Sequence, residues 1–398
     1  MKKGLFSIIV FTICLVLLVL SVQFYLDARR HQLIRELTSE DTVDTGNADR
    51  SELPDKHITI DRETAVTRTI AAASPAIIGI HVTMIQEYSS NPFFNDPFFR
   101  RFFPNNIYKK RIQSMGSGVL ISEDGYIVTN AHVLGDNAVE IYVTLSGGKR
   151  YPAERVGSDP LTDIALLKID EKDLPYIEMG DSDDIMIGEW VIALGNPFGL
   201  FNVSDKPIAT VGIISSTNMN FGETREGYVY QDMIQTDASI NSGNSGGGLV
   251  NMNGELIGIN TFIFTGNDYG ASGSVGIGFA IPINRVREIV EELKLHGNIE
   301  RDWDFGISGQ PLTPSIINYY QLDTDHGIII IDIREGKAGD KAGLRVGDII
   351  LSVNDQVVKR NQDVVDIINN SYLKVGDSIK AQIYRDGEEL SVEIPLEK

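Results

Sequence analysis

Between residues 62 and 282 the chain is a succession of short apolar segments separated by glycine, asparagine and aspartate. Examples are residues 138–143, 190–194 and 276–281. Short apolar runs bounded by turn residues are typical of all-β sandwiches and barrels. The length of 398 residues leaves room for a second domain beside this body. We therefore predict a mainly β fold for this part of the chain.

A glycine-rich turn surrounds Ser245, with the sequence GNSGG over residues 243–247. A serine nucleophile needs an exposed hydroxyl on a tight turn, and nearby backbone N–H groups must converge to stabilise an oxyanion. Many loops without chemistry also have this composition. The assignment of Ser245 as a nucleophile therefore depends on finding its partners.

Two candidate partners lie upstream. His132 follows a predicted hairpin over residues 118–128, whose Asp124-Gly125 pair is a strong turn signal. Asp163 opens an apolar strand, where a lone carboxylate is unfavourable unless it is paired. The order His, Asp, Ser is that of the two-barrel β proteases. The alternatives are a structural histidine and a strand-edge carboxylate, and we interpret His81 as a structural residue.

The motifs TNAHV, TDIALL and GNSGG, in this order and spacing, resemble the HtrA/Deg family of trypsin-like serine proteases. The resemblance runs from about residue 65 to the C-terminus. It implies a chymotrypsin-like double β-barrel protease domain, built from two six-stranded barrels that divide near residue 180. His132 and Asp163 would come from the first barrel and Ser245 from the second.

Triad chemistry and this resemblance give each residue an expected role. Ser245 attacks the peptide carbonyl, His132 transfers the proton as general base and acid, and Asp163 orients the imidazole. The resemblance implies an oxyanion hole made by the backbone N–H groups of Gly243 and Ser245. Because Asn244 carries no charge to pair with a new N-terminus, we expect control by loop ordering rather than by N-terminal cleavage.

The substrate pocket is predicted to be small and apolar. Position 239, six residues before the nucleophile, is Ser239, so no acidic side chain stands there to attract lysine or arginine. Ile240, Ile259 and Asn260 are expected to line the pocket. Cleavage after valine, isoleucine or alanine follows from this lining.

Residues 303–396 carry the pattern of a second domain. An apolar strand over 327–333, short helices over 337–344 and 364–369, and a hairpin turn at Asp386-Gly387 resemble a PDZ domain of the HtrA type, an α+β fold. A helix over residues 284–295, with Asn284 as its N-cap and Gly297 after its end, would join the two domains.

PDZ domains bind an extended C-terminal peptide as an added strand and hold its carboxylate with backbone N–H groups. The matching loop offers the N–H groups of Phe305, Gly306 and Ile307. Ile307 and residues near Val365 and Ile368 are expected to line the peptide pocket. The alternative is that the loop only begins a strand.

The N-terminus carries an apolar run over residues 5–26, preceded by Lys2 and Lys3. About 20 such residues span a bilayer core. No small-residue cleavage site follows, so we predict an uncleaved signal anchor; a cleaved signal peptide is the alternative. The single cysteine, Cys14, lies within this run and excludes an intramolecular disulfide.

Four regions result from this reading. We predict a cytoplasmic stub and transmembrane signal anchor at 1–26, a polar tether at 27–61, a serine protease domain at 62–298 and a PDZ domain at 299–398. The anchor and the single PDZ domain resemble the membrane-anchored, DegS-like branch of the family, whereas the length of the insert at 91–104 resembles its soluble, quality-control members. The DegS-like resemblance implies a bacterial inner-membrane protein with both domains on the periplasmic side, and a homotrimer.

Two loops are candidate regulators. Residues 91–104 are rich in phenylalanine, arginine and proline, which is typical of a contact surface, within the subunit or between subunits. Residues 198–231 correspond by resemblance to a sensor loop. Our hypothesis is that peptide binding at the PDZ domain reorders this loop, which then sets the turn at Ser245.

Charge and motif content restrict the partners. The net charge of −20 disfavours nucleic-acid binding, which needs a basic face. No Cys/His cluster has metal-ligand spacing and no glycine-rich loop has a phosphate-binding context, so we expect no cofactor. The predicted function is an ATP-independent serine endopeptidase of the cell envelope, which cleaves misfolded or anti-sigma-factor-type regulatory proteins. The alternatives are a PDZ-based binding or chaperone sensor with little protease activity, and a structural envelope protein.

Overall fold

The computed structural model describes residues 63–89, 107–196, 206–224, 227–241, 243–263, 276–322 and 324–398. Residues Glu63–Lys398 form one compact unit. Among the described residues, no helix is long and apolar enough to cross a membrane. The predicted signal anchor, the tether and the segment 91–104 lie outside the described residues.

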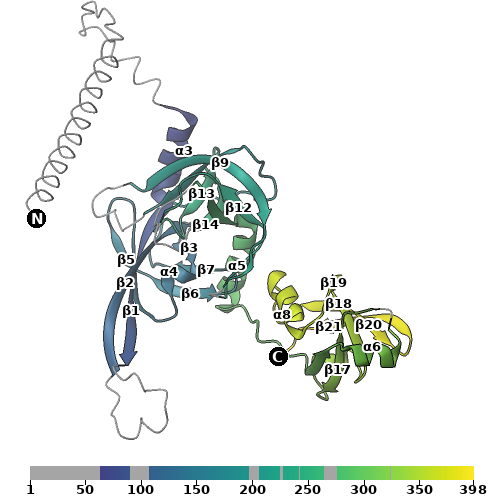
Figure 1. Cartoon of the computed structure of the whole chain (residues 1–398). Coiled ribbons are helices and arrows are strands. Elements are labelled where there is room, and N and C mark those ends of the chain that lie inside the picture. Colours follow the sequence, from purple (N-terminus) through teal and green to yellow (C-terminus); the bar gives the residue numbers. More distant parts are fainter. Residues whose placement is uncertain are drawn as a thin grey trace, which may run out of the picture. The chain divides into compact units, whose positions relative to one another are not determined.

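A seven-stranded antiparallel sheet forms the first half of the protease body, in the order β5-β4-β1-β2-β3-β7-β6 (Figure 1). Its strands are β1 (Ile77–Ser89), β2 (Ile107–Leu120), β3 (Tyr126–Asn130), β4 (Ala138–Thr144), β5 (Arg150–Pro152), β6 (Glu154–Asp159) and β7 (Ile164–Lys168). This sheet corrects our expectation of a six-stranded first barrel. The strand β5 at its edge has only three residues and ends in proline, so no apolar alternation marks it in the sequence.

The second half is a closed six-stranded barrel in the order β12-β15-β14-β13-β8-β9, as expected. Its strands are β8 (Trp190–Gly195), β9 (Ile208–Met219), β12 (Met233–Thr236), β13 (Gly248–Asn251), β14 (Leu256–Ile263) and β15 (Gly278–Pro282). Outside the barrel, β10 (Gly222–Glu223) and β11 (Val229–Tyr230) form a two-stranded ribbon. This ribbon lies within the predicted sensor loop.

Short helices frame the two sheets. They are α3 (Ala65–Ala73), the 3₁₀ helix η2 (Ser74–Ala76), α4 (Ala131–Leu134) and α5 (Ile283–His296). The helix α5 buries Ile289 and Leu293 in the same core as the first sheet. Its N-cap is Pro282 and not Asn284, because the Asn284 side chain donates to Asp181 (2.7 Å). Gly297 ends the helix in the left-handed conformation, as expected (φ 75°).

The C-terminal sheet has the order β16-β17-β18-β20-β21, with β19 paired to β18. Its strands are β16 (Ile307–Pro311), β17 (Ile328–Ile333), β18 (Ile349–Val353), β19 (Gln356–Val357), β20 (Ser378–Arg385) and β21 (Glu388–Pro395). The accompanying helices are α6 (Pro314–Tyr320), α7 (Ala338–Lys341) and α8 (Asn361–Asn370). Since β16 is an edge strand, a peptide can add to it.

Candidate active site

The backbone around β3 and β7 brings His132 and Asp163 together. These strands pair as far as Asn130 and Ile164, so the residues that follow and precede them are neighbours. The carbonyl oxygen of Asp163 accepts from the backbone N–H of Ala131 (3.0 Å) and from the Asn130 amide (3.1 Å). The start of α4 is thereby fixed against Asp163.

The Asp163 carboxylate is fully buried and faces the His132 ring. His132 Nδ1 lies 2.8 Å from Oδ2 and 3.0 Å from Oδ1. The backbone N–H of His132 also donates to Oδ1 (3.0 Å). A proton on Nδ1 donates to the carboxylate, which leaves Nε2 to accept a proton from a nucleophile. Asp163 itself has φ 58°, a conformation that this hydrogen-bonding stabilises.

Two further hydroxyl groups donate to Asp163 Oδ2. They belong to Tyr230 (2.9 Å) and Thr261 (2.9 Å). Burial, followed by the negative charge of Asp163, raises the pKa of Tyr230, so its hydroxyl stays protonated as a donor. The sequence predicted no contact of either residue with Asp163: it placed Thr261 beside Asn260 in the substrate pocket and gave Tyr230 no role, because neither stands in one of the three motifs.

The Ser245 turn is packed against β2. Gly246 has φ 82°, and a Cβ there would lie 2.2 Å from the carbonyl oxygen of Ser117. The Ser245 hydroxyl donates to the carbonyl oxygen of Thr261 (2.6 Å), and in the described part of the chain no hydrogen bond joins it to His132. Thr261 therefore contacts Asp163 through its hydroxyl and Ser245 through its carbonyl. The structure thus brings all three predicted catalytic residues into one site.

The turn leaves two backbone donors for an oxyanion. The N–H of Asn244 donates to Asn241, and that of Gly246 to Asn260. The N–H groups of Gly243 and Ser245 have no acceptor among the described residues. These are the two donors that the resemblance implies, and their role stays a prediction.

The three predicted pocket residues are all closed to solvent. Ile240 and Ile259 are buried in hydrophobic cores. The Asn260 amide donates to the carbonyl oxygens of Leu194 (3.3 Å) and Gly248 (3.1 Å). The substrate preference stays a prediction, since all three side chains are buried.

In the PDZ domain, a cavity of about 190 Å³ lies beside β16 and α8. Ile307 and Val365 line it, as expected. Phe305, which was expected only as a backbone donor, lines it too, and so do Trp303 and Asn361, which the sequence analysis did not name. Ile368 does not line it and is buried in the domain core instead.

The Gly306 N–H, one of the three expected carboxylate donors, is engaged by a neighbouring side chain. It donates to Asp304 Oδ1 (2.9 Å). Asp304 also pairs with Arg334 (2.5 Å) and Lys337 (3.3 Å). A peptide carboxylate at this loop must therefore compete with the carboxylate of Asp304.

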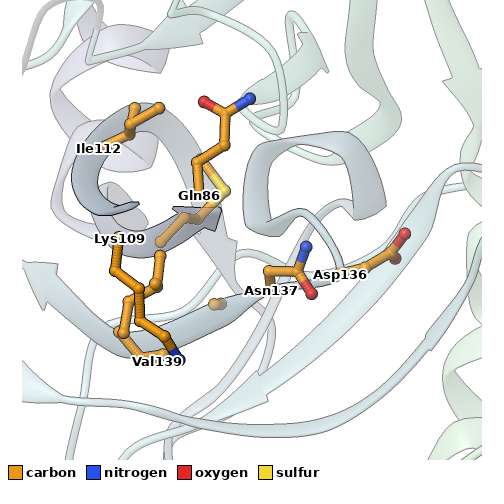
Figure 2. A pocket seen from close by; sticks show the side chains of 9 residues that line it. Gln86, Lys109, Ile112, Asp136, Asn137 and Val139 are labelled. Carbon is orange, nitrogen blue, oxygen red and sulfur yellow. The ribbon is translucent and has the colours of Figure 1, made fainter. Parts of the chain in front are cut away.

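A larger cavity of about 780 Å³ lies between the β1–β2 hairpin and residues 136–139, and none of the triad residues is among its described lining. Figure 2 shows Gln86, Lys109 and Asp136 around it. The described residues of its lining include no serine, cysteine or histidine. Within the described ranges, no group of three metal-ligating side chains is placed to hold an ion.

Fold and site together define a class, namely a trypsin-like serine protease followed by a PDZ domain. Comparison with family models agrees, because residues 116–259 match the trypsin-like peptidase domain and residues 304–396 match the PDZ domain. The chain belongs to the HtrA/DegP-type family of serine proteases, as the relatives below establish.

The curated relatives include a probable periplasmic serine endoprotease, DegP-like, of Chlamydia trachomatis. It is 40% identical over 317 residues, which are 78% of this chain and 60% of the relative. A protein of the same description from Marinomonas is 36% identical, with 83% and 71% of the two chains covered. The chain thus spans about 60% of the length of the first relatives it matches.

Solved structures are also similar. One is an HtrA-type protease, AlgW, with a decapeptide, with a TM-score of 0.59 and 37% identity. The match covers 83% of this chain and 98% of that one. A serine endoprotease from Yersinia pestis has a TM-score of 0.54 and 32% identity, covering 84% and 98%.

Proposed function

We propose that the protein is an ATP-independent serine endoprotease of the bacterial cell envelope, anchored in the inner membrane through residues 1–26. It cleaves misfolded or regulatory proteins of the anti-sigma-factor type, and peptide binding at the PDZ domain regulates it. The observation that carries the proposal is the buried Asp163 carboxylate on His132 Nδ1, beside the Ser245 turn.

The site residues divide the reaction between them. His132 Nε2 takes the proton from Ser245 as the serine oxygen attacks the peptide carbonyl, and then returns it to the leaving amine. Asp163 holds the ring and stabilises the imidazolium. The N–H groups of Gly243 and Ser245 receive the oxyanion. A water molecule then hydrolyses the acyl-enzyme by the same steps.

The position of the Ser245 hydroxyl supports a resting state with low activity. Its proton is engaged by the Thr261 carbonyl at 2.6 Å, so the hydroxyl must rotate before His132 can accept that proton. A ligand that favours the rotated arrangement raises the rate in proportion to its differential affinity for the two states.

Contacts between the PDZ domain and the sensor loop support regulation by peptide. The Tyr372 hydroxyl, just beyond α8, donates to the carbonyl oxygen of Val229 (2.6 Å) and accepts from the N–H of Gln231 (3.0 Å). The Gln231 amide also donates to Asn370 (3.1 Å). Residues 229–231 end the loop that leads into β12 and the Ser245 turn.

Cleavage of unfolded casein by the purified full chain tests the proposal. We expect cleavage that Ser245→Ala abolishes and that apolar C-terminal peptides accelerate many-fold. Cleavage that survives in Ser245→Ala would refute the nucleophile. A folded wild-type protein that binds peptides but cleaves nothing would support the PDZ-based sensor instead.

The membrane anchor and the oligomeric state need separate measurements. Protease accessibility of the two domains from the outer face of spheroplasts tests the anchor and its orientation. Sedimentation equilibrium of the full chain in detergent tests the homotrimer that the family resemblance implies. A chain released with the soluble fraction, or a monomer at all concentrations, would contradict these two points.

A further inference from the structure

The triad aspartate has more hydrogen-bond donors than its histidine partner supplies. Its Oδ2 atom faces His132 Nδ1 and accepts from Tyr230 (2.9 Å) and Thr261 (2.9 Å). A buried carboxylate needs such donors because no water replaces its lost hydration. Each donor restricts the direction in which the carboxylate points, and hence the orientation of the His132 ring.

Tyr230 is built into this site rather than lying at its edge. Its side chain is only 6% exposed. Its oxygen lies 3.4 Å from the Thr261 hydroxyl, a longer contact than its 2.9 Å bond to Asp163. The Tyr230 ring packs beside the Tyr228 ring, with 6.2 Å between the ring centroids. The Tyr228 ring meets the His132 ring edge-on, with 6.3 Å between their centroids. From its two oxygen–oxygen distances, the Tyr230 hydroxyl donates its one proton to Asp163.

The strand that carries Tyr230 has little support of its own. β11 has two residues and, among the described strands, pairs with the two-residue β10 alone. Its backbone is held instead by other contacts. The N–H of Val229 donates to Leu161 (2.7 Å), two residues before Asp163.

The PDZ residue Tyr372 completes this support. Its hydroxyl bonds to the carbonyl oxygen of Val229 and to the N–H of Gln231, which are the peptide groups on the two sides of Tyr230. The Tyr372 ring lies under the Arg285 guanidinium, 4.2 Å from the ring centroid. Arg301 binds the Tyr372 carbonyl oxygen (2.6 Å). The phenol is thus held from several sides.

From these contacts we infer that Tyr230 is a positioning residue of the triad, which fixes Asp163 through its hydroxyl, and that Tyr372 of the PDZ domain holds Tyr230 in place. The inference rests on the proposed protease function, and it assigns the contacts of Tyr372 with Val229 and Gln231 a second effect on the site. This effect is on the aspartate, whereas the sensor-loop hypothesis concerns the Ser245 turn.

The variant Tyr230→Phe tests the first half, because it keeps the ring and removes only the hydroxyl. In the full chain we expect kcat to fall about tenfold with little change in KM, as for a lost hydrogen bond to a charged group. With one donor fewer, Asp163 carries more uncompensated charge and favours the imidazolium. The acid limb of the kcat/KM pH profile therefore moves to higher pH.

The matched control is Tyr151→Phe, which removes a tyrosine hydroxyl from the exposed carboxylate of Glu171 (2.8 Å). We expect wild-type kinetics from it. An unchanged kcat and pH profile in Tyr230→Phe would overturn the inference. A fall in kcat with an unmoved acid limb would also overturn it, since that result indicates a merely structural tyrosine.

A measurement without substrate separates this inference from the proposed function. The proton on His132 Nδ1 is observable by low-field proton NMR when its hydrogen bond is ordered. We expect its signal to broaden or vanish in Tyr230→Phe and to persist in Tyr151→Phe, whether or not the wild-type chain cleaves casein. An equally sharp signal in Tyr230→Phe would overturn the inference.

A double-mutant cycle tests the second half. Tyr372→Phe should lower kcat a few-fold in the wild-type background and have no further effect in the Tyr230→Phe background, because both changes act through one contact. Equal effects of Tyr372→Phe in the two backgrounds would overturn the tie between Tyr372 and Tyr230.

Discussion

The hydroxyl of Ser117 donates to the carbonyl oxygen of Gly243 at 2.6 Å, which joins the first sheet to the nucleophile turn. The same hydroxyl accepts from the backbone N–H of Asn196 (2.7 Å). The backbone N–H of Ser117 donates to the carbonyl oxygen of Ser245 (2.9 Å). One residue of β2 thus holds the turn on both sides of Asn244, at the two residues, Gly243 and Ser245, whose N–H groups are the expected oxyanion donors.

We predict that Ser117→Ala lowers kcat/KM for casein peptides by about tenfold to a hundredfold, which is less than the roughly hundredfold to thousandfold loss found when an oxyanion donor is removed outright. The freed Gly243 carbonyl lets the turn rotate, so its N–H groups lose their alignment. The measurement is steady-state kinetics, with stability followed by circular dichroism. Ser378→Ala removes a surface hydroxyl bonded to Glu393 (2.5 Å) and should leave kcat/KM unchanged. Wild-type kinetics in Ser117→Ala would refute this role.

Much of this site was predictable because triad residues stand in short motifs with turn signals around them. The hairpin at Asp124-Gly125 placed His132 after a strand, the apolar run after Asp163 placed that residue at the start of another, and the family resemblance implied that the two meet. By contrast, Tyr230 and Ser117 also contact the site, although Tyr230 stands 15 residues before Ser245 and Ser117 stands 128 residues before it. Such contacts arise from barrel closure and sheet packing, and no local pattern records them.

The fold was predictable to a similar extent. The apolar segments predicted a fold made mainly of strands, and the Asp386-Gly387 pair predicted a hairpin turn. Both turn residues have positive φ (51° and 95°). The edge strand β5 was missed because its three residues, Arg150 to Pro152, pair at a sheet edge through their backbone and show no apolar period. Asn284 was assigned wrongly as an N-cap because its amide has a tertiary partner, Asp181, that the local sequence cannot indicate.

Asp304 should weaken peptide binding at the PDZ loop. The Gly306 N–H, then Arg334 and Lys337, hold the pKa of its carboxyl below its usual range, so it is ionised at neutral pH and occupies a donor that the peptide needs. We predict that Asp304→Ala tightens binding of an apolar C-terminal peptide by about threefold to tenfold. Isothermal titration calorimetry measures this, with the exposed Asp325→Ala as control. Weaker binding in Asp304→Ala would mean that Asp304 shapes the loop for the peptide.

Arg301 connects the two domains through a buried ion pair. Its guanidinium lies 2.8 Å from Asp159, and the two side chains are 15% and 2% exposed. We predict that Arg301→Met lowers the free energy of unfolding by about 3 kcal/mol, because it leaves the Asp159 charge buried without its partner. Urea denaturation measures the loss, and adding Asp159→Asn should recover part of it.

The control for this pair is Arg334→Met, since Arg334 and Asp304 form an exposed pair that contributes roughly 0–1 kcal/mol. Similar losses in Arg301→Met and Arg334→Met would contradict the prediction, because they would show that burial adds nothing to the Arg301 contact.

Tyr372 gives the interdomain contact a defined pH dependence. Burial raises the pKa of Tyr372 from 10.0 to about 12. Its folded pKa lies above its unfolded value, so the folded chain binds more protons between these two values. The resulting stabilisation is fully present below about pH 10 and is lost as the pH rises toward 12. Since one pKa unit corresponds to about 1.4 kcal/mol, the loss is on the order of 1–3 kcal/mol.

We therefore predict that the free energy of unfolding of the wild-type chain falls more steeply between pH 10 and pH 12 than that of Tyr372→Phe. Lysines titrate in the same window in both proteins, so the difference between the two curves isolates Tyr372. Urea denaturation at several pH values gives both curves. Parallel curves would mean that the Tyr372 hydroxyl is as accessible to water in the folded chain as in the unfolded one. The hydrogen bonds from this hydroxyl to Val229 and Gln231 would then be too weak to hold Tyr230 in place.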